Sequence, residues 1–177
     1  MEFIQPSNKI DGVQIANLRA FGDDRGRFSE IFRHEWFPQV DWLCLQSNRS
    51  ESKAGVLRGL HYHFHQIDYW HVLRGTIRAG MVDLRPESPT YKATQLVEMR
   101  GEDLLGLFIP EGVAHGFYAV TDCLLLYYVN NYYDGNDEFG VAWDDPEIGL
   151  DWRAETPLVS ERNQNNPRLG EIPQEAV

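Results

Sequence analysis

Short runs of apolar or alternating residues, separated by turn signals, recur along the whole sequence. The clearest runs are 42–45, 69–73, 76–84, 104–109, 116–120 and 124–133. The segments between them are rich in Asp, Gly, Pro and Asn, as in the Asp-Gly-Asn-Asp stretch at 134–137. Many short strands without intervening helices favour an antiparallel sandwich or barrel. We therefore expect an all-β fold, in which 29–40 offers at most a turn or two of helix.

The length of 177 residues and the hydrophobic content of 42% fit one folded domain, spanning residues 1–177. From Trp143 onward the chain is rich in Asp, Pro and Asn, and its apolar residues are widely spaced. This part is too short for a second domain, and no low-complexity linker precedes it. We expect it to form an irregular C-terminal wrap over the barrel.

Charge and cysteine content restrict the partners and the compartment. The net charge is −11, and Lys and Arg are scattered singly, which argues against binding to nucleic acid or to an anionic membrane. No apolar run approaches the roughly 20 residues that cross a bilayer, and the N-terminus lacks the apolar stretch of a secretory signal. Cys44 and Cys123 lie in apolar sequence and form no disulfide framework. We expect a cytoplasmic protein.

Three histidines alternate along one expected strand: His61, His63 and His65. Alternation points their side chains to one face of the sheet. The opposite face carries Leu60, Tyr62 and Phe64, which we expect to pack against a second sheet. The histidines then line the interior cavity of the barrel. A neutral imidazole there can accept a proton from a carbon beside a ketone, or it can ligate a metal.

The spacing of polar residues around these histidines also resembles the two metal-binding motifs of the cupin superfamily. Those motifs contain two alternate histidines, a glutamate and a later histidine. The corresponding residues here are His61, His63, Asp68 and His115. Asp68 stands where the superfamily has its glutamate, and Ala119 replaces the asparagine of the second motif. Such a set suits iron, manganese, nickel, zinc or copper. Alternatively, His63 and His65 form hydrogen bonds in a polar cavity and hold no metal.

Several short motifs follow one another in a specific order and spacing. They are DRGRF at 24–28, QSN at 46–48, GVLRGLHY at 55–62, VDLR at 82–85 with SPT at 88–90, IPEG at 109–112 with AHGF at 114–117, and WDDP at 143–146. Together they resemble the dTDP-4-dehydrorhamnose 3,5-epimerase family, nucleotide-sugar epimerases of the cupin superfamily, over about residues 12–167. The resemblance implies a cupin-type jelly-roll barrel. It also implies a homodimer in which N-terminal strands exchange between subunits and contribute to the neighbour's nucleotide site.

The family chemistry is epimerisation beside the 4-keto group of a 4-keto-6-deoxyhexose nucleotide. A base removes the proton on carbon 3 or carbon 5, and an acid returns a proton to the other face. The resemblance implies that His61 is the base and Tyr127 the acid, whereas Tyr128 faces the other way on the strand. His115 lies in the matched stretch at 109–117 and belongs to the same catalytic set. In this interpretation the chain uses no cofactor.

The resemblance also implies a nucleotide-binding set. Arg25 and Arg58 match arginines that grip the diphosphate, where a planar guanidinium donates two parallel hydrogen bonds. The polar groups that match positions near the base and the phosphates are Glu30, Gln46 and Asn48. Tyr133 matches an aromatic residue on which the base stacks.

Two positions depart from the family pattern. Asp68 stands where the family has a lysine that stabilises the enolate, and a carboxylate there would repel that negative charge. Losing one such donor typically costs about 100- to 1,000-fold in rate. Asn163 stands where the family has an aspartate that orients the base, and a neutral amide stabilises an imidazolium less well.

Three interpretations follow from these departures. In the first, the chain is a nucleotide-sugar epimerase that acts at carbon 3, carbon 5 or both. In the second, one divalent transition metal, held by the four-residue set that contains His61, His63, Asp68 and His115, replaces the lost lysine. The motif at 58–63 also resembles the paired histidines of nucleotide-sugar 3,4-ketoisomerases. In the third, the chain is a noncatalytic sugar-nucleotide binding protein.

Overall fold

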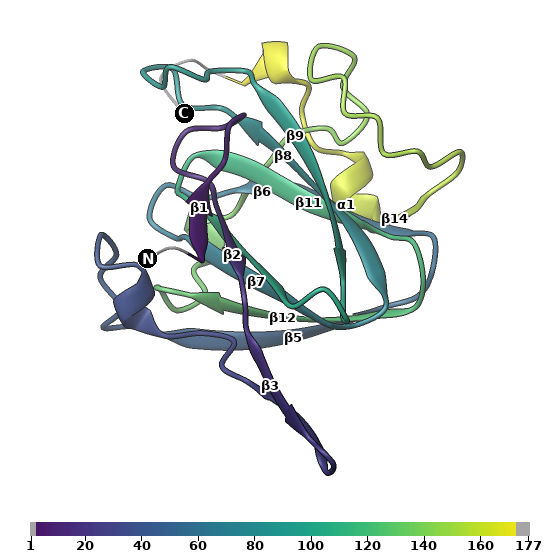
Figure 1. Cartoon of the computed structure of the whole chain (residues 1–177). Helices are drawn as coiled ribbons and strands as arrows, with labels where there is room; N and C mark the ends of the chain where they lie inside the picture. The colour runs from purple at the N-terminus through teal and green to yellow at the C-terminus, as the bar shows by residue number, and fades with distance from the viewer. Residues whose placement is uncertain (1–2, 173–177) are drawn as a thin grey trace.

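The computed structural model describes residues 3–172. Residues 1–2 and 173–177, which include the ends of the expected domain and of the expected wrap, lie outside the described part. Two large sheets face each other in Figure 1, which confirms the all-β expectation. Among the helices of residues 3–172, none is long and apolar enough to cross a membrane.

Each sheet mixes strands from distant parts of the chain. The first has the order β1 (Ile4–Pro6), β2 (Gln14–Asn17), β10 (Leu105–Ile109), β7 (Asp68–Arg74), β12 (Cys123–Val129), β5 (Gln46–Ser52). The second has the order β13 (Phe139–Gly140), β6 (Val56–Tyr62), β11 (Val113–Ala119), β8 (Thr76–Asp83), β9 (Thr94–Arg100). Neighbours within both orders pair antiparallel, whereas β14 (Leu158–Val159) pairs parallel with β6.

Strands β7 and β8 lie in different sheets and are joined at Gly75, which has φ +80°. A Cβ atom at this position would lie 2.2 Å from the carbonyl oxygen of Asp122. Both the positive φ and the close backbone therefore require glycine. This tight turn carries the chain directly from one sheet to the other, so that the two sheets enclose a common interior.

The apolar runs predict most of the central strands. Those at 69–73, 76–84, 104–109, 116–120 and 124–133 overlap β7, β8, β10, β11 and β12. The run at 42–45 is not a strand; it forms a turn in which Leu43 is 87% exposed. Strand β5 follows directly and has no apolar run, because Gln46, Asn48 and Ser50 point into a polar cavity.

The main core lies between the sheets. It is built from alternate residues of the central strands, such as Trp70 and Val72 of β7 with Met81 of β8 and Leu125 of β12. Tyr69, which directly precedes Trp70, packs on the outer face of the first sheet, in a second apolar cluster. Because both faces of β7 are buried, its sequence reads as a continuous apolar run.

The outer face of the second sheet carries a third cluster. Leu60 and Tyr62 of β6 are buried there, and Phe64 packs against them. Their partners are not a second sheet, as we expected, but the C-terminal segment, through Val141, Trp152 and other apolar residues. The widely spaced apolar residues of this segment supply the anchors, which is why it needs little regular structure of its own.

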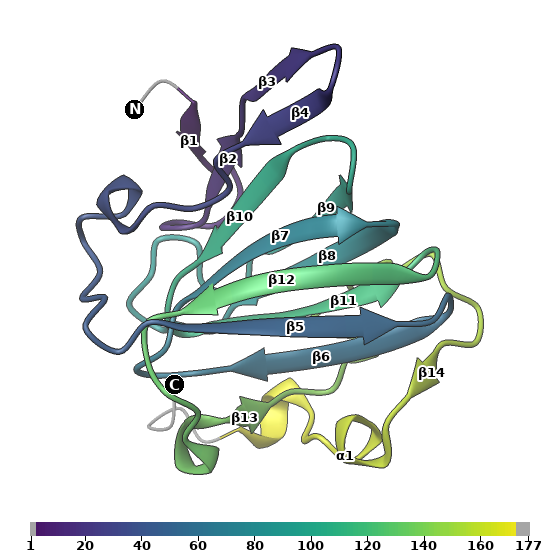
Figure 2. The same ribbon diagram turned by 90° about the horizontal axis from the view of Figure 1, so that it is seen from below.

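The C-terminal segment forms the expected wrap over the second sheet, visible beyond β6 in Figure 2. In this segment, strand β14 pairs with β6 through Leu158 and Val159. Helix α1 (Glu161–Gln164) begins two residues later, and the 3-10 turn η3 (Leu169–Glu171) follows. The side chain of Ser160 caps α1 by accepting a hydrogen bond from the backbone N–H of Asn163 at 3.3 Å. This local geometry places Asn163 next to β6.

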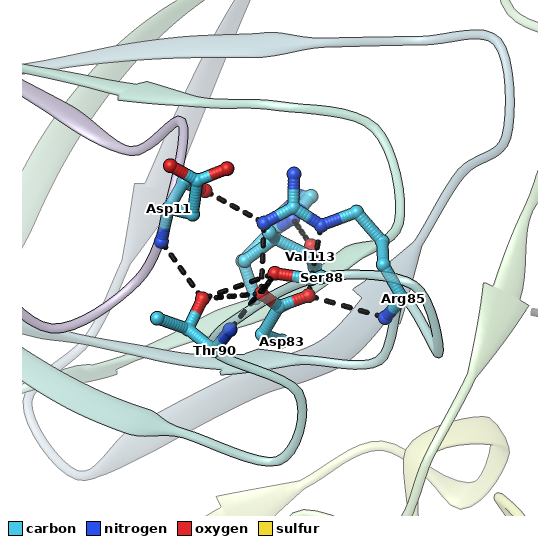
Figure 3. Close-up of polar contacts among 7 residues, drawn as sticks. Asp11, Asp83, Arg85, Ser88, Thr90 and Val113 are labelled. Carbon is cyan, nitrogen blue, oxygen red and sulfur yellow. Dashed lines mark hydrogen bonds and ion pairs between the residues drawn. The ribbon is translucent and has the colours of Figure 1, made fainter.

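The motif at 82–90 has a structural role (Figure 3). The buried carboxylate of Asp83 accepts hydrogen bonds from the guanidinium of Arg85 and from the hydroxyls of Ser88 and Thr90, at 2.6–2.8 Å. Arg85 also donates to the carbonyl oxygen of Asp11 at 2.6 Å. Burial alone would raise the pKa of Asp83, but these hydrogen bonds outweigh it and hold the pKa below its usual value. The network ties the loop before β2 to the end of β8.

Strands β3 (Ala20–Asp23) and β4 (Gly26–Ser29) form a separate hairpin that projects away from both sheets in Figure 2. The exposed aromatic residues Phe21 and Phe28 lie opposite each other in its register. After the hairpin, the expected helical turn in 29–40 is a single 3-10 turn, η1 (His34–Trp36).

Candidate active site

A cavity of about 300 Å³ opens between the two sheets. Its inner end is apolar, because Trp70, Phe117 and Leu125 belong both to the core and to the cavity wall. Most expected site residues line it: His61, Tyr127, His115, Asp68, Gln46, Asn48, Arg58 and Tyr133. The alternation argument holds for the histidines, since His61, His63 and His65 all face this cavity.

His61 is held by the C-terminal wrap. Its Nε2 donates a hydrogen bond to Oδ1 of Asn163 at 2.8 Å, so the neutral ring carries its lone pair on Nδ1. Burial lowers the pKa of His61 below its ordinary value of 6.5, and the hydrogen bond to Asn163 offsets part of that shift. The ring is therefore neutral at pH 7, and Nδ1 can accept a proton.

Strand β12 presents Tyr127 to the cavity and Tyr128 to the opposite face. Tyr128 stacks on Phe32 outside the first sheet, with ring centroids 4.4 Å apart. Burial raises the pKa of Tyr127, and the negative charges of Asp68 and Glu138 add to the shift. Tyr127 therefore keeps its proton at neutral pH and can act as a donor.

A second group of side chains lines the same cavity. His63, Asp68 and His115 each place one potential ligand atom within 4.8 Å of the others. His61 is not part of this group among the described residues, so the four-residue metal set expected from the sequence reduces to three. Burial lowers the pKa of His115 well below its ordinary value, which outweighs the opposite effect of Asp68.

The polar mouth of the cavity is formed by β5 and the chain after β12. Gln46 donates to Oδ1 of Asn48 at 2.9 Å and accepts a hydrogen bond from the backbone N–H of Tyr133 at 3.3 Å. Arg58 crosses from β6 and donates to the hydroxyl of Ser52 at 2.9 Å, which connects the edges of the two sheets. Amides, a guanidinium and an exposed phenol ring are suited to hold a nucleoside diphosphate.

Two expected binding residues do not line this cavity. Arg25 lies at the tip of the β3–β4 hairpin, where its side chain is 90% exposed and pairs with Asp23. Glu30 follows the hairpin and pairs with Arg33 at the surface. Within one chain, therefore, neither residue is placed to contact a molecule in the cavity.

The sequence interpretation overlooked the cavity residues of one connecting loop. Asp137, at the end of the 3-10 turn η2 (Gly135–Asp137), accepts hydrogen bonds through its carboxylate from the backbone of Phe64 and His65, at 2.8 and 3.1 Å. Glu138 pairs with Arg162 of α1 at 3.0 Å. The turn composition of 134–137 predicts only a turn, and the consecutive acidic residues Asp137 and Glu138 next to the strand at 139–140 are the one sequence feature that marks this loop.

Both the sequence and the structure of this chain match one family of known proteins. The family model described as dTDP-4-dehydrorhamnose 3,5-epimerase matches residues 7–171. A dTDP-4-dehydrorhamnose 3,5-epimerase from Methanothermobacter thermautotrophicus is 37% identical over 180 residues, which cover 97% of each chain.

Solved structures agree with the sequence relatives. The dTDP-6-deoxy-D-glucose-3,5-epimerase from Legionella pneumophila, in complex with dTDP-4-keto-L-rhamnose, has a TM-score of 0.91 at 32% identity and covers 98% of this chain and 96% of its own. A 3'-monoepimerase from Streptomyces bikiniensis, in complex with dTDP-quinovose, has a TM-score of 0.87 at 32% identity and covers 94% and 87%. The two facing sheets thus form the expected cupin-type jelly-roll barrel. This chain belongs to the dTDP-4-dehydrorhamnose 3,5-epimerase family, whose members are isomerases.

Proposed function

We propose that this protein epimerises a 4-keto-6-deoxyhexose nucleotide at carbon 3, carbon 5 or both. The observation that carries the proposal is His61, which lines the cavity as a neutral imidazole with Nδ1 free of the hydrogen bond to Asn163. In this proposal Nδ1 removes the proton on the carbon beside the ketone. The electron pair of that C–H bond forms a carbon–carbon double bond, and the keto π electrons move onto oxygen, which gives an enolate.

Tyr127 completes the proposed epimerisation. Its phenol donates a proton to the other face of the same carbon, where the electron pair of the carbon–carbon double bond forms the new C–H bond. A lone pair of the enolate oxygen re-forms the ketone, and the configuration at that carbon is inverted. Solvent then reprotonates Tyr127 and removes the proton from His61. Asn163 acts as a positioning residue, because it fixes the ring orientation of His61 from behind the cavity wall.

We propose a dTDP sugar as the substrate. The Legionella and Streptomyces proteins are described in complex with dTDP-4-keto-L-rhamnose and dTDP-quinovose. In this chain, Arg58, Gln46 and Asn48 would contact the diphosphate and the base, and the exposed ring of Tyr133 would stack on the base.

We also infer a homodimer in which the β3–β4 hairpin reaches the partner's cavity. The hairpin projects from the sheets and exposes Phe21 and Phe28, which a partner would cover. This arrangement gives Arg25 and Glu30 a role in nucleotide binding that they do not have within one chain. We also propose a cytoplasmic location, because Cys44 and Cys123 are free thiols, as is usual in a reducing compartment.

The proposed function is tested by incubating the purified full chain with dTDP-4-keto-6-deoxyglucose in D₂O and following the sugar by NMR. Incorporation of deuterium at carbon 3 or carbon 5, with formation of the inverted sugar, supports epimerisation and identifies the carbon. Migration of the ketone to carbon 3 would instead indicate the 3,4-ketoisomerase. Tight binding without label or rearrangement would indicate the noncatalytic binding protein.

A further inference from the structure

The lone pairs of His63 and His115 are fixed by hydrogen bonds on the far side of each ring. Nδ1 of His63 donates to the carbonyl oxygen of Asp137 at 2.6 Å, and Nδ1 of His115 donates to the carbonyl oxygen of Val113 at 2.9 Å. A carbonyl oxygen only accepts, so both Nδ1 atoms carry the proton. In both neutral rings the lone pair therefore lies on Nε2. This is how proteins orient histidines that ligate metals.

Asp68 is oriented in the same way. Its Oδ1 accepts a hydrogen bond from Nε1 of Trp70 at 2.9 Å, and its Oδ2 accepts one from the side-chain amide of Gln66 at 3.1 Å. The carboxylate thus has partners that hold it in place, while Oδ2 keeps capacity for one more contact. Only 4% of the Asp68 side chain is exposed.

Oδ2 of Asp68 and Nε2 of His115 face each other at 3.7 Å, which is longer than a hydrogen bond. In the tautomer set by Val113, both atoms are acceptors. Two electron-rich atoms that face each other in a buried site are unfavourable unless a cation lies near both. His63 contributes a third such atom within 4.8 Å.

We propose that His63, Asp68 and His115 form a binding site for one divalent first-row transition-metal ion, separate from His61. Two imidazole nitrogens and one carboxylate oxygen suit zinc, manganese, iron, cobalt or nickel, and such a set leaves further positions open toward the cavity. Ligand bonds of about 2.0–2.2 Å would draw the three atoms somewhat closer than they lie now. His63, the half-buried member, has the most freedom to move.

The separation from His61 matters for chemistry. Nε2 of His61 is occupied by Asn163, so His61 remains a proton acceptor and the ion acts beside it. The catalytic use of the ion rests on the function proposed above. A cation held by Asp68 would stabilise the negative charge of the enolate oxygen, which the carboxylate alone would repel. The ion bound to Asp68 would then supply the positive charge that the lysine supplies in the family.

The binding test uses full-length protein stripped with a chelator and then titrated with Co²⁺ and Zn²⁺. We expect one ion per chain by elemental analysis after dialysis, a visible absorption band with Co²⁺, and a Tm raised by about 5 °C at saturating Zn²⁺. His63→Gln and Asp68→Asn should each weaken binding by at least about 100-fold. His63→Gln is the safer variant for folding, because this side chain is less buried than that of Asp68.

Two control variants make the ligand assignment specific. His65→Gln removes a histidine that lines the same cavity but is outside the group, and it should leave the metal affinity unchanged. His61→Gln should also retain the ion. No stoichiometric uptake by the unmodified protein, or equal uptake by folded His63→Gln and Asp68→Asn, would overturn the site. A loss of binding in His61→Gln would overturn the separation from His61.

Deuterium exchange into the keto sugar tests the catalytic use of the ion separately from its binding. We expect stripped protein to lose at least about 100-fold in exchange rate and to regain it with added metal. Equal exchange with and without the ion would overturn this role and leave the binding result intact. Metal binding is measured without substrate, so a failure of the epimerase proposal would not affect it.

Discussion

Nε2 of His61 donates a hydrogen bond to Oδ1 of Asn163 at 2.8 Å, across 102 positions of sequence. The contact joins the cavity strand β6 to the first turn of α1, which β14 holds beside β6. The proposed base and the residue that orients it are thus adjacent in the fold but come from distant parts of the sequence. The C-terminal wrap, which has little regular structure, therefore contributes a residue to the proposed active site.

The charge of the residue at position 163 should set the pH dependence. His61 must be neutral to accept a proton, and burial lowers its pKa below about 6.5, so kcat/KM should fall only as the pH drops below that value. Asn163→Asp places a carboxylate on Nε2 and raises the pKa of His61, so the acidic limb should move up by about one unit or more. The check is a pH profile of kcat/KM. Asn163→Ala is the control and should lower kcat without that upward move.

Tyr127 and Tyr128 provide a matched pair, because neighbouring positions of one strand face opposite sides. Tyr127→Phe removes the proposed proton donor and should reduce net epimerisation by about 100-fold or more, while deuterium exchange by His61 continues. Tyr128→Phe keeps the ring that stacks on Phe32 and should retain the activity. The measurement compares product formation with exchange for both variants. Equal effects of the two substitutions would argue against Tyr127 as the acid.

The Asp83 network should dominate the local stability of the loops before β2 and after β8. Asp83→Asn removes the countercharge of the half-buried guanidinium of Arg85 and weakens the hydrogen bonds to a fully buried acceptor, so it should cost about 2–3 kcal/mol in the free energy of unfolding, measured with urea. Glu102→Ala, at an exposed turn, is the control and should change it by less than about 0.5 kcal/mol.

The same network makes a prediction about acid. The pKa of Asp83 in the folded chain lies below the usual 3.8, so its ionised form stabilises the fold at pH values above about 4. That contribution is lost as the pH falls through the lowered pKa. The stability difference between the original protein and Asp83→Asn should therefore shrink below about pH 4. A difference that stays constant down to pH 2 would contradict the assignment.

The inferred dimer predicts complementation between two defective variants. Arg25→Ala should raise KM, and His61→Ala should abolish turnover. If Arg25 serves the partner's cavity, a mixed dimer contains one cavity with both original residues, so an equal, re-equilibrated mixture should recover about a quarter of the full activity at low substrate concentration. A mixture with only the mean activity of the two separate variants would show that Arg25 does not act across subunits.

Strand period and motif order made much of this fold predictable. The apolar runs found β7, β8, β10, β11 and β12, because these strands bury one or both faces. Strand β5 gave no apolar run because the side chains that it turns toward the cavity are polar, so its sequence lacks the hydrophobic alternation that indicates a strand. The run at 42–45 failed because its apolar residues lie in a turn that leaves Leu43 exposed.

The site was less predictable than the fold. Alternation placed His61, His63 and His65 on one face, and the family motifs located Tyr127 and Arg58. Sequence spacing could not show that His61 would be separate from the other metal-ligand candidates. That separation depends on the three-dimensional contact in which Asn163 of the C-terminal wrap forms a hydrogen bond with Nε2 of His61. Asp137 was missed since its backbone carbonyl, not its residue type, orients His63. The extent of the domain over 1–177 stays a prediction.

The most direct test of the central claim is the rate of deuterium exchange into a dTDP-4-keto-6-deoxy sugar by the original protein and by His61→Asn. The amide cannot accept a proton from carbon, so we predict that exchange at the carbon beside the ketone falls by about 10²- to 10⁴-fold. His34→Asn, which changes an exposed histidine, serves as the control. Unchanged exchange in a folded His61→Asn protein would contradict the account.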